Sequence, residues 1–310
     1  MSDKTWTVQS ILDWCTGFLE RAGIENARHS AQWLLSEALD MSRIDLYTNF
    51  DKPLSEAERA TMRDWVRRRA AGEPLQLISG KAPFRYLTIQ VAEGVLIPRP
   101  ETEVLVSEAF NELSLPRVAE RVAATEEGEC IVAPTLPALR AVDLCTGSGC
   151  IACALATEYP AAQVLALDIS PEALDLASRN VEVLGVADRV EVRESDLLSA
   201  VSPEEEASYN LIISNPPYIP SRVVEELDRE VTDYEPALAL DGGEDGLDLY
   251  RAFLPDALRL LAPDGVMAVE LHETCLDEAV LLAEEAGFDR VRKVQDLAGR
   301  DRVLIARKPA

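Results

Sequence analysis

The first 80 residues carry apolar side chains at helical spacing. Between positions 8 and 21 the spacing places one apolar face on a helix, and a similar pattern returns over 26–39. A capping box at Ser55 opens a third helix, which ends at Gly72. We therefore expect a small helical domain over residues 1–80, with the end of the third helix and its three arginines exposed to solvent.

From residue 140 the pattern changes to short apolar segments that alternate with amphipathic ones. Alternation of strands and helices predicts an α/β fold, with a mainly parallel sheet and helices on both of its faces. We expect seven strands in this sheet. The expected strands are 140–145, 163–168, 189–194, 210–214, 265–271, 290–295 and 302–307, and the expected helices are 149–158, 171–184, 247–261 and 276–286.

Two further regions separate the helical domain from this sheet. Residues 81–100 alternate like a hairpin and connect the two parts, and a helix is expected from Glu101 to Leu113. Residues 114–138 are acidic, contain three prolines and show no clear period, so we interpret them as a surface insertion. The large domain is thus expected to span 101–310.

A glycine-rich turn joins the first expected strand of the sheet to an apolar helix. Glycines let the backbone approach a ligand closely, and the start of a helix offers free N–H groups. The turn lacks the dinucleotide fingerprint, because Cys145 takes the place of its first glycine, and no Gly-Lys-Ser/Thr follows as in a P-loop. The turn therefore favours a nucleoside ligand that carries no phosphate.

Asp168 ends the next expected strand, about 20 residues past the glycine turn. An acidic residue at this place can accept hydrogen bonds from ribose hydroxyls. The alternative is a helix cap, but Ser170 followed by Pro171 is better suited to that role. We expect Asp168 to face the ligand.

The apolar strand 210–214 leads directly into Asn215-Pro216-Pro217-Tyr218. Such a stretch is often a plain turn, but here it follows a strand downstream of the glycine turn. Each proline fixes its own φ and favours extended geometry in the residue before it. The side-chain carbonyl of Asn215 and the backbone carbonyl of Pro216 can thus accept the two N–H bonds of a planar NH2 group, while the ring of Tyr218 packs on that group.

These motifs, in this order and spacing, resemble those of class I S-adenosylmethionine-dependent methyltransferases. More narrowly, the chain is similar to the protein-(glutamine-N5) methyltransferases that modify bacterial peptide-chain release factors. The segment 96–103 is similar to the stretch that this family carries before its catalytic domain. Segments 234–247 and 296–302 are similar to its post-catalytic loop and last hairpin, so the resemblance covers almost the whole chain.

The resemblance implies a Rossmann-like class I methyltransferase fold, S-adenosyl-L-methionine as cofactor, and methyl transfer to the side-chain nitrogen N5 of the glutamine in a Gly-Gly-Gln motif. Catalysis and amide binding fall to Asn215, Pro216, Pro217 and Tyr218, with Asn215 also next to the cofactor. The remaining cofactor contacts are assigned to Cys145, Thr146, Gly147, Ser148 and Gly149 (methionine and ribose), Asp168 (ribose hydroxyls), and Asp196 and Leu197 (adenine), where Leu197 would give apolar packing.

Net charge limits the choice of partner. The chain carries −25, and residues 84–310 hold 43 acidic against 19 basic side chains. Such a surface repels nucleic acid, and it suits a protein substrate that is basic in places. There is no apolar run of 18 residues and no signal-peptide pattern. We expect a soluble, cytoplasmic monomer that binds a release factor, no nucleic acid and no membrane, and we expect the helical domain 1–80 to dock this protein substrate.

Metal chemistry and three other functions were weighed as alternatives. Cys150 and Cys153 lie inside an apolar helix, and the spacing for four metal ligands is absent, so no metal is expected. Methylation of a glutamine in a ribosomal protein is the sister activity, which the Ile97–Glu101 segment disfavours. Adenine-N6 methylation of nucleic acid conflicts with the acidic surface. A noncatalytic cofactor-binding module conflicts with the intact Asn-Pro-Pro-Tyr.

Overall fold

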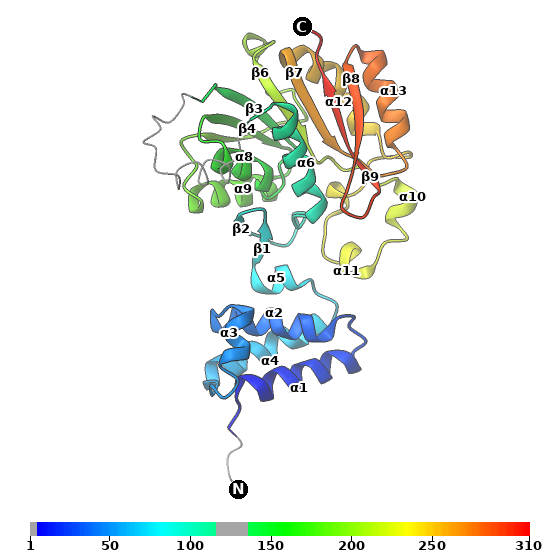
Figure 1. The fold of residues 1–310 in the computed structure, drawn as a ribbon. Coiled ribbons are helices and arrows are strands. Elements are labelled where there is room, and N and C mark those ends of the chain that lie inside the picture. Colours follow the sequence, from blue (N-terminus) through cyan, green and yellow to red (C-terminus); the bar gives the residue numbers. More distant parts are fainter. Residues whose placement is uncertain (1–4, 116–135) are drawn as a thin grey trace. The chain divides into compact units, whose positions relative to one another are not determined.

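The computed structural model describes residues 5–115 and 136–310 (Figure 1). Most of the expected surface insertion, residues 116–135, therefore lies outside the described residues. The chain divides into two compact units. Unit 1 holds the residues up to Lys81 together with 228–234, and unit 2 holds 82–227 and 235–310.

Unit 1 is helical, as its apolar spacing predicts. Thr7, Ser42 and Ser55 each form a capping box that starts a helix. The apolar faces meet in a core in which Leu34, Leu35 and Val66 are fully buried. Its helices are α1 (Val8–Arg21), α2 (Ala27–Leu39), α3 (Arg43–Thr48), α4 (Glu56–Ala70), α5 (Leu75–Ser79) and α11 (Arg229–Thr232).

The expectation that the arginines at the end of α4 are all solvated is wrong for Arg69. Its side chain is buried, donates to the backbone carbonyl of Glu73 at 2.8 Å, and pairs with Glu230 at 2.9 Å. Glu230 belongs to the segment 228–234 of the same unit. The sequence does not reveal the Arg69–Glu230 ion pair, because the two residues are 161 positions apart.

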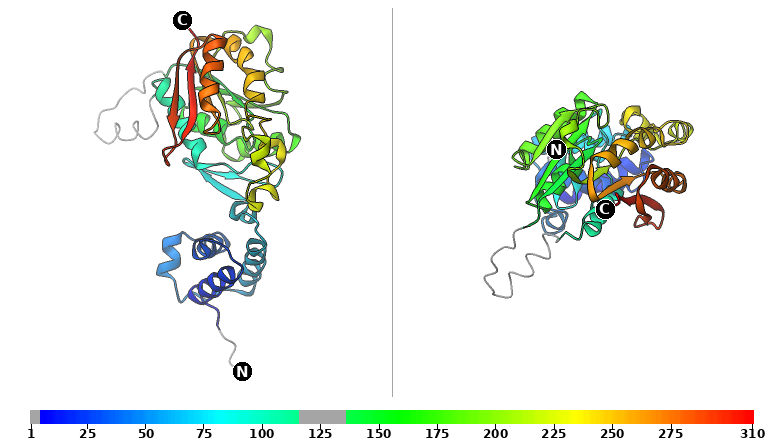
Figure 2. Two further views of the ribbon diagram at one scale, coloured as in Figure 1. Left: turned by 90° about the vertical axis from the view of Figure 1, so that its right-hand side faces the viewer. Right: turned by 90° about the horizontal axis from the view of Figure 1, so that it is seen from above.

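Unit 2 contains the seven-stranded α/β sheet that the alternation of segments predicts. Its strands follow the order β5-β4-β3-β6-β7-β9-β8, and pairing is parallel except for β9, which runs antiparallel to both neighbours. Figure 2 shows β8 and β9 together at one edge of the sheet. The strands are β3 (Leu139–Leu144), β4 (Ala162–Asp168), β5 (Val190–Glu194), β6 (Tyr209–Ser214), β7 (Leu261–Glu270), β8 (Asp289–Gln295) and β9 (Asp301–Arg307).

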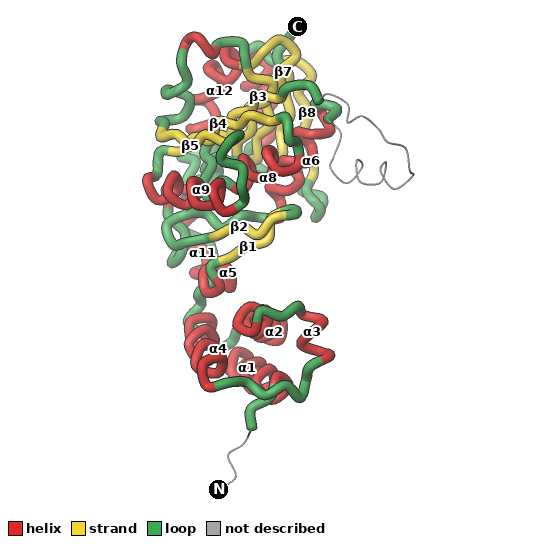
Figure 3. Tube along the Cα trace, turned by 90° about the vertical axis from the view of Figure 1, so that its left-hand side faces the viewer, coloured by secondary structure: helices red, strands yellow, loops and turns green. Residues whose placement is uncertain are grey.

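Helices cover both faces of this sheet, because successive strand residues point to opposite sides. Ala141 packs in the core cluster under α6, α8 and α9, and its neighbour Val142 packs in the cluster under α12 and α13. Figure 3 shows α8 and α9 in front of the strands and α12 behind them. The helices are α6 (Pro100–Glu112), α8 (Cys150–Glu158), α9 (Pro171–Val183), α10 (Ser221–Val224), α12 (Asp248–Leu260) and α13 (Leu276–Ala286), and a hairpin of β1 (Lys81–Phe84) and β2 (Leu87–Gln90) precedes them.

Candidate active site

Four loops at the carboxyl ends of β3, β4, β5 and β6 line one cavity of about 470 Å³. Ligands of open α/β sheets bind at this edge. The cavity brings together nine residues that the sequence singled out: Cys145, Thr146, Gly147, Ser148, Asp168, Asp196, Leu197, Asn215 and Pro217. Gly149, Pro216 and Tyr218 belong to the same loops but are not among the residues that line the cavity.

The glycine turn after β3 has the backbone geometry of a ligand-binding turn. Gly147 and Gly149 have φ of +55° and +77°, which glycine adopts at little cost. Cys145 has φ +59°, a left-handed backbone conformation that glycine adopts more readily than cysteine. Buried Asp143 holds the turn, since its Oδ2 accepts from the Thr146 hydroxyl at 2.5 Å and from the Ala152 N–H at 3.0 Å. Burial raises the pKa of Asp143 to about 7.

Asp168 lines the cavity and also holds two neighbouring loops by hydrogen bonds. One carboxylate oxygen accepts the Gly147 N–H at 2.8 Å, and the other accepts the Ser170 N–H at 3.0 Å. Ser170 caps α9, as the sequence predicts, because its hydroxyl accepts from Ala173 at 3.3 Å. Each carboxylate oxygen keeps a second lone pair for a ligand. Asp168 thus fixes the glycine turn while it faces the cavity.

Apolar side chains line the part of the cavity beside Asp196. Leu197 is half-buried with φ +50°, and Ile169 from the loop after β4 lines the same cavity. Asp196 itself is exposed. A flat, uncharged ring could pack between such side chains, and a polar ring edge could reach the Asp196 carboxylate.

Asn215 lines the cavity and is held from behind by Thr102. Its side-chain NH2 donates to Thr102 Oγ1 at 3.0 Å. Thr102 belongs to the first turn of α6, inside the segment 96–103. Among the described residues, Oδ1 of Asn215 has no hydrogen-bond partner, so this carbonyl remains available to a ligand.

Tyr218 is fixed at both its hydroxyl and its ring. The hydroxyl donates to Glu270 Oε1 at 2.9 Å, and the Arg302 guanidinium lies 5.8 Å from the ring centre. Burial and the charge of Glu270 raise the pKa of Tyr218, so the phenol keeps its proton. The sequence singled out this ring for packing on an amide, and no contact in the structure tests that role.

Two loops that the sequence left without a site also line the cavity. Gly94, Val95, Leu96, Pro98 and Thr102 come from the segment before and within the start of α6, and Pro236, Leu238 and Ala239 come from the loop that precedes α12. Arg99 joins the two loops, since its Nη2 contacts both carboxylate oxygens of Glu235 at 2.6 and 2.7 Å. Arg99 is therefore an ion-pair residue at the cavity wall.

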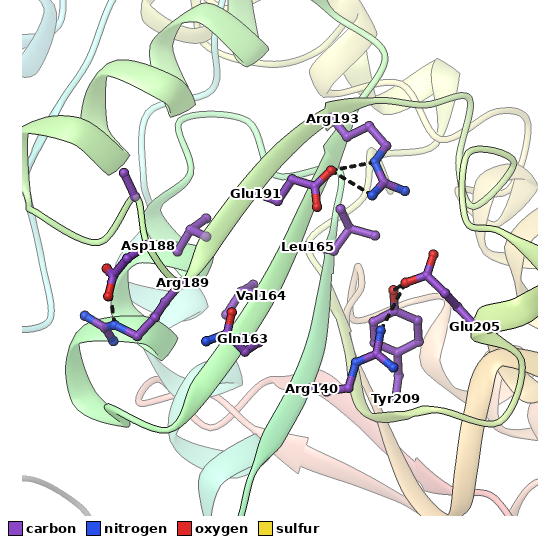
Figure 4. Close-up of a pocket in the computed structure, with 12 residues that line it drawn as sticks. Arg140, Gln163, Val164, Leu165, Asp188, Arg189, Glu191, Arg193, Glu205 and Tyr209 are labelled. Carbon is purple, nitrogen blue, oxygen red and sulfur yellow. Dashed lines mark hydrogen bonds and ion pairs between the residues drawn. The ribbon is translucent and has the colours of Figure 1, made fainter.

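A second cavity of about 580 Å³ lies at β3, β4 and β5 (Figure 4). Three arginines line it, and each is paired with a carboxylate. It offers no unpaired cation to an anionic ligand, so we assign it no function. The pairs are Arg140 with Glu205, Arg189 with Asp188, and Arg193 with Glu191.

Within 5–115 and 136–310, no group of three or more His, Cys, Asp or Glu side chains is placed to hold a metal ion. None of the helices described there has the length and apolar character that crossing a membrane requires.

Comparison with known proteins adds names to this geometry. The model of the PrmC N-terminal domain matches residues 10–80, and that of the methyltransferase small domain matches 125–231. A "Release factor glutamine methyltransferase" of Geobacter sulfurreducens is 43% identical over 304 residues, covering 98% of either chain. The protein of the same name from Rhodopirellula baltica is 38% identical over 308 residues, covering 99% of this chain and 98% of its own.

Solved structures share the fold at low identity. The "hMettl16 catalytic domain in complex with MAT2A 3'UTR hairpin 6" is 14% identical with a TM-score of 0.54, covering 78% of this chain and 81% of that chain. The "delta-N METTL16 MTase domain" is 17% identical with a TM-score of 0.51, covering 79% and 97%. At these identities the likeness concerns the methyltransferase fold alone.

Proposed function

The chain belongs to the release factor glutamine methyltransferases, and we propose that it transfers a methyl group from S-adenosylmethionine to the glutamine of the Gly-Gly-Gln motif in peptide-chain release factors. The atom methylated is the side-chain amide nitrogen, N5. Several proteins of this name are 37% to 43% identical to the chain over nearly its full length, which supports the assignment. The enzyme class, a methyltransferase, follows from the family itself.

The cavity has the donor set that S-adenosylmethionine needs. The N–H groups at the start of α8, apart from that of Ala152, which donates to Asp143, suit the polar methionine end, and the Asp168 carboxylate suits the ribose hydroxyls. Leu197 and Ile169 offer apolar packing to the adenine, with Asp196 at its edge. A volume of about 470 Å³ lies within the usual range of ligand pockets. When bound, this cofactor supplies a methyl group that its sulfonium has already activated.

The protein's own task is to place the amide nitrogen. An amide nitrogen is a poor nucleophile, because its lone pair is delocalised into the carbonyl. Asn215 Oδ1 and the Pro216 carbonyl accept its two N–H bonds and direct the lone pair toward the methyl group. Both dipoles also stabilise the positive charge that develops on nitrogen. Tyr218 packs near the amide plane.

One observation carries this proposal. The Asn215 side-chain NH2 donates to Thr102, its carbonyl has no partner among the described residues, and Asn215 lines the cavity that the glycine turn also lines. A DNA or RNA base could meet the same acceptors, but the excess of 43 acidic over 19 basic side chains in residues 84–310 opposes a phosphate backbone. A ribosomal protein glutamine remains the second candidate, which the Ile97–Glu101 segment disfavours.

The test uses purified, unmethylated release factor, the enzyme and S-adenosylmethionine. Intact mass and peptide mapping should find one added methyl group, on the glutamine of Gly-Gly-Gln. The control variant Asn215→Ala should lose this methyl transfer. Transfer to a ribosomal protein or to DNA instead, with none to the release factor, would replace the substrate and keep the fold and cofactor assignments.

Gly242→Ala is expected to lower kcat indirectly, through a displacement of the Asn-Pro-Pro-Tyr backbone. A Cβ at Gly242 would lie 2.7 Å from the Tyr218 Cα and 2.8 Å from the Pro217 carbonyl oxygen, so the Asn-Pro-Pro-Tyr backbone must move. A displacement of this kind should cost about tenfold or more in kcat, measured under saturating cofactor. The matched control is Gly17→Ala in α1, where only the end of the Arg21 side chain is near. Equal kcat in both variants would contradict the expectation.

We further propose that unit 1 docks the release factor as a folded protein. Its surface exposes Trp14 by 42% and Ile44 by 75%, although it has a complete apolar core of its own. Large exposed aromatic side chains are the usual energetic centres of protein interfaces. The catalytic cavity by itself needs only the glutamine and its immediate neighbours.

Replacement of Trp14 and Ile44 by serine should therefore change the KM for one substrate and not for another. The KM for intact release factor is expected to rise about tenfold, since an interface centre is lost. The KM for a short peptide containing Gly-Gly-Gln should stay at its wild-type value. Glu20→Gln, another exposed position on α1, is the control. If both KM values rise together, unit 1 has no docking role.

A further inference from the structure

Glu270 connects the two side chains that the proposed reaction uses most. It ends β7, is 1% exposed, and accepts hydroxyl hydrogen bonds from Thr102 at 2.7 Å and from Tyr218 at 2.9 Å. Thr102 is also 1% exposed, and its oxygen accepts from the Asn215 NH2 at 3.0 Å. One buried carboxylate is thus joined to Asn215 through Thr102 and to Tyr218 directly.

The donor and acceptor properties of these groups fix the direction of each hydrogen bond. The Thr102 and Tyr218 hydroxyls both donate to Glu270, so the single hydroxyl proton of Thr102 is committed to this carboxyl group. The Thr102 oxygen can then take only a donor from Asn215, and the side-chain NH2 is that donor. The carbonyl of Asn215, which lines the cavity, therefore points away from Thr102 and is left for a ligand. A flipped amide would set an NH2 against the NH2 of the substrate.

Two hydroxyl donors and one cation around Glu270 favour its ionised form. Burial, together with the Glu101 charge, outweighs them and raises the pKa of this carboxyl, while the Thr102 and Tyr218 hydroxyls and the Arg302 charge limit the rise. Arg302 is itself buried, with its guanidinium over the Tyr218 ring. Two donors and a nearby cation are the surroundings that allow a buried carboxylate to persist.

We propose that Thr102 and Glu270 are positioning residues for methyl transfer. They set the amide orientation of Asn215 and the place of the Tyr218 ring, and neither needs to contact the reacting atoms. The inference rests on the proposed function in that Asn215 receives the substrate amide. It also gives a physical reason for the segment 96–103, because Thr102 is the residue through which that segment reaches Asn215.

A double-mutant cycle in kcat tests the connection. Thr102→Val keeps the shape and removes the hydroxyl, and it should lower kcat about tenfold or more, with KM for release factor and cofactor affinity changing little. Thr102→Ser should restore most of that loss. In an Asn215→Ala background, Thr102→Val should change kcat less than about twofold, since its target is gone. Equal losses in both backgrounds would overturn the proposal.

A matched control and a second measurement keep the test independent of turnover. Thr16→Val removes a hydroxyl that donates to the Leu12 carbonyl in α1, and it should leave kcat unchanged. In isotope-labelled enzyme, the Asn215 side-chain NH2 signal should exchange with water more slowly in wild type than in Thr102→Val. Equal exchange would refute the positioning role. If the wild-type enzyme methylates no release factor, the proposed function fails, while the exchange experiment still decides this inference.

Discussion

Asn215→Ala is expected to lower kcat for release factor methylation by roughly 100-fold or more, the usual cost of one lost transition-state dipole. The variant removes the carbonyl that, in the proposed reaction, accepts one amide N–H and helps to direct the nitrogen lone pair. It leaves the glycine turn and Asp168 in place, so affinity for S-adenosylmethionine should change little. Single-turnover kinetics at saturating cofactor measure the transfer step directly.

The control for this variant is Asn49→Ala, which removes an exposed asparagine from unit 1. It should keep the wild-type transfer rate and melting temperature. Loss of cofactor affinity in Asn215→Ala, equal to its loss in rate, would indicate that the cavity had collapsed. Full turnover by Asn215→Ala would contradict its catalytic role.

The features that the sequence could predict are those set by neighbouring residues. Of the four strands that carry a site loop, β3, β4 and β6 are mainly apolar and are followed within two residues by a polar residue, whereas β5 alternates apolar and charged residues. Parallel pairing then brings these loops to one edge, so Gly147, Asp168 and Asn215 line one cavity. Local pattern and the rules of parallel sheets were sufficient for this part.

The features that the sequence could not predict depend on partners far apart in the chain. Thr102 and Glu270 are 168 positions apart, and they meet because α6 packs beside β7. Neither side chain has a local signature, since Thr102 lies in a helical first turn and Glu270 ends an ordinary strand. The same holds for Arg99 with Glu235. Helices of four to six residues, such as α3 and α10, are too short to show a period.

The resemblance to a family and the geometry contribute different things to the site. The family indicates which segments matter, whereas the contacts give reasons. Segment 96–103 supplies Thr102 to Asn215, and the loop containing Gly242 lies against the Asn-Pro-Pro-Tyr backbone, where a side chain has no space. Both segments thus act on the same turn from different elements. The catalytic turn is held by its neighbours as much as by its own two prolines.

Asp168→Ala is expected to weaken S-adenosylmethionine binding at least about 100-fold, because two roles are lost together. Its carboxylate accepts the Gly147 N–H at 2.8 Å, and the proposed ligand adds the ribose hydroxyls. Hydrogen bonds to a charged group contribute about 1.5–3 kcal/mol each, and about 1.4 kcal/mol corresponds to a factor of ten in affinity. Titration calorimetry with the cofactor measures the loss without any methyl transfer.

Two matched variants separate the contributions to this loss. Asp168→Asn keeps one carbonyl oxygen but presents an NH2 to the other donor, so it should fall between wild type and alanine. Asp175→Ala removes an exposed carboxylate on α9, paired only with Arg179 at its surface, and it controls for the weaker attraction of a cationic ligand. Its affinity should equal that of wild type. Binding by Asp168→Ala as tight as by Asp175→Ala would place the ribose elsewhere, and the glycine turn alone would then have to hold the cofactor.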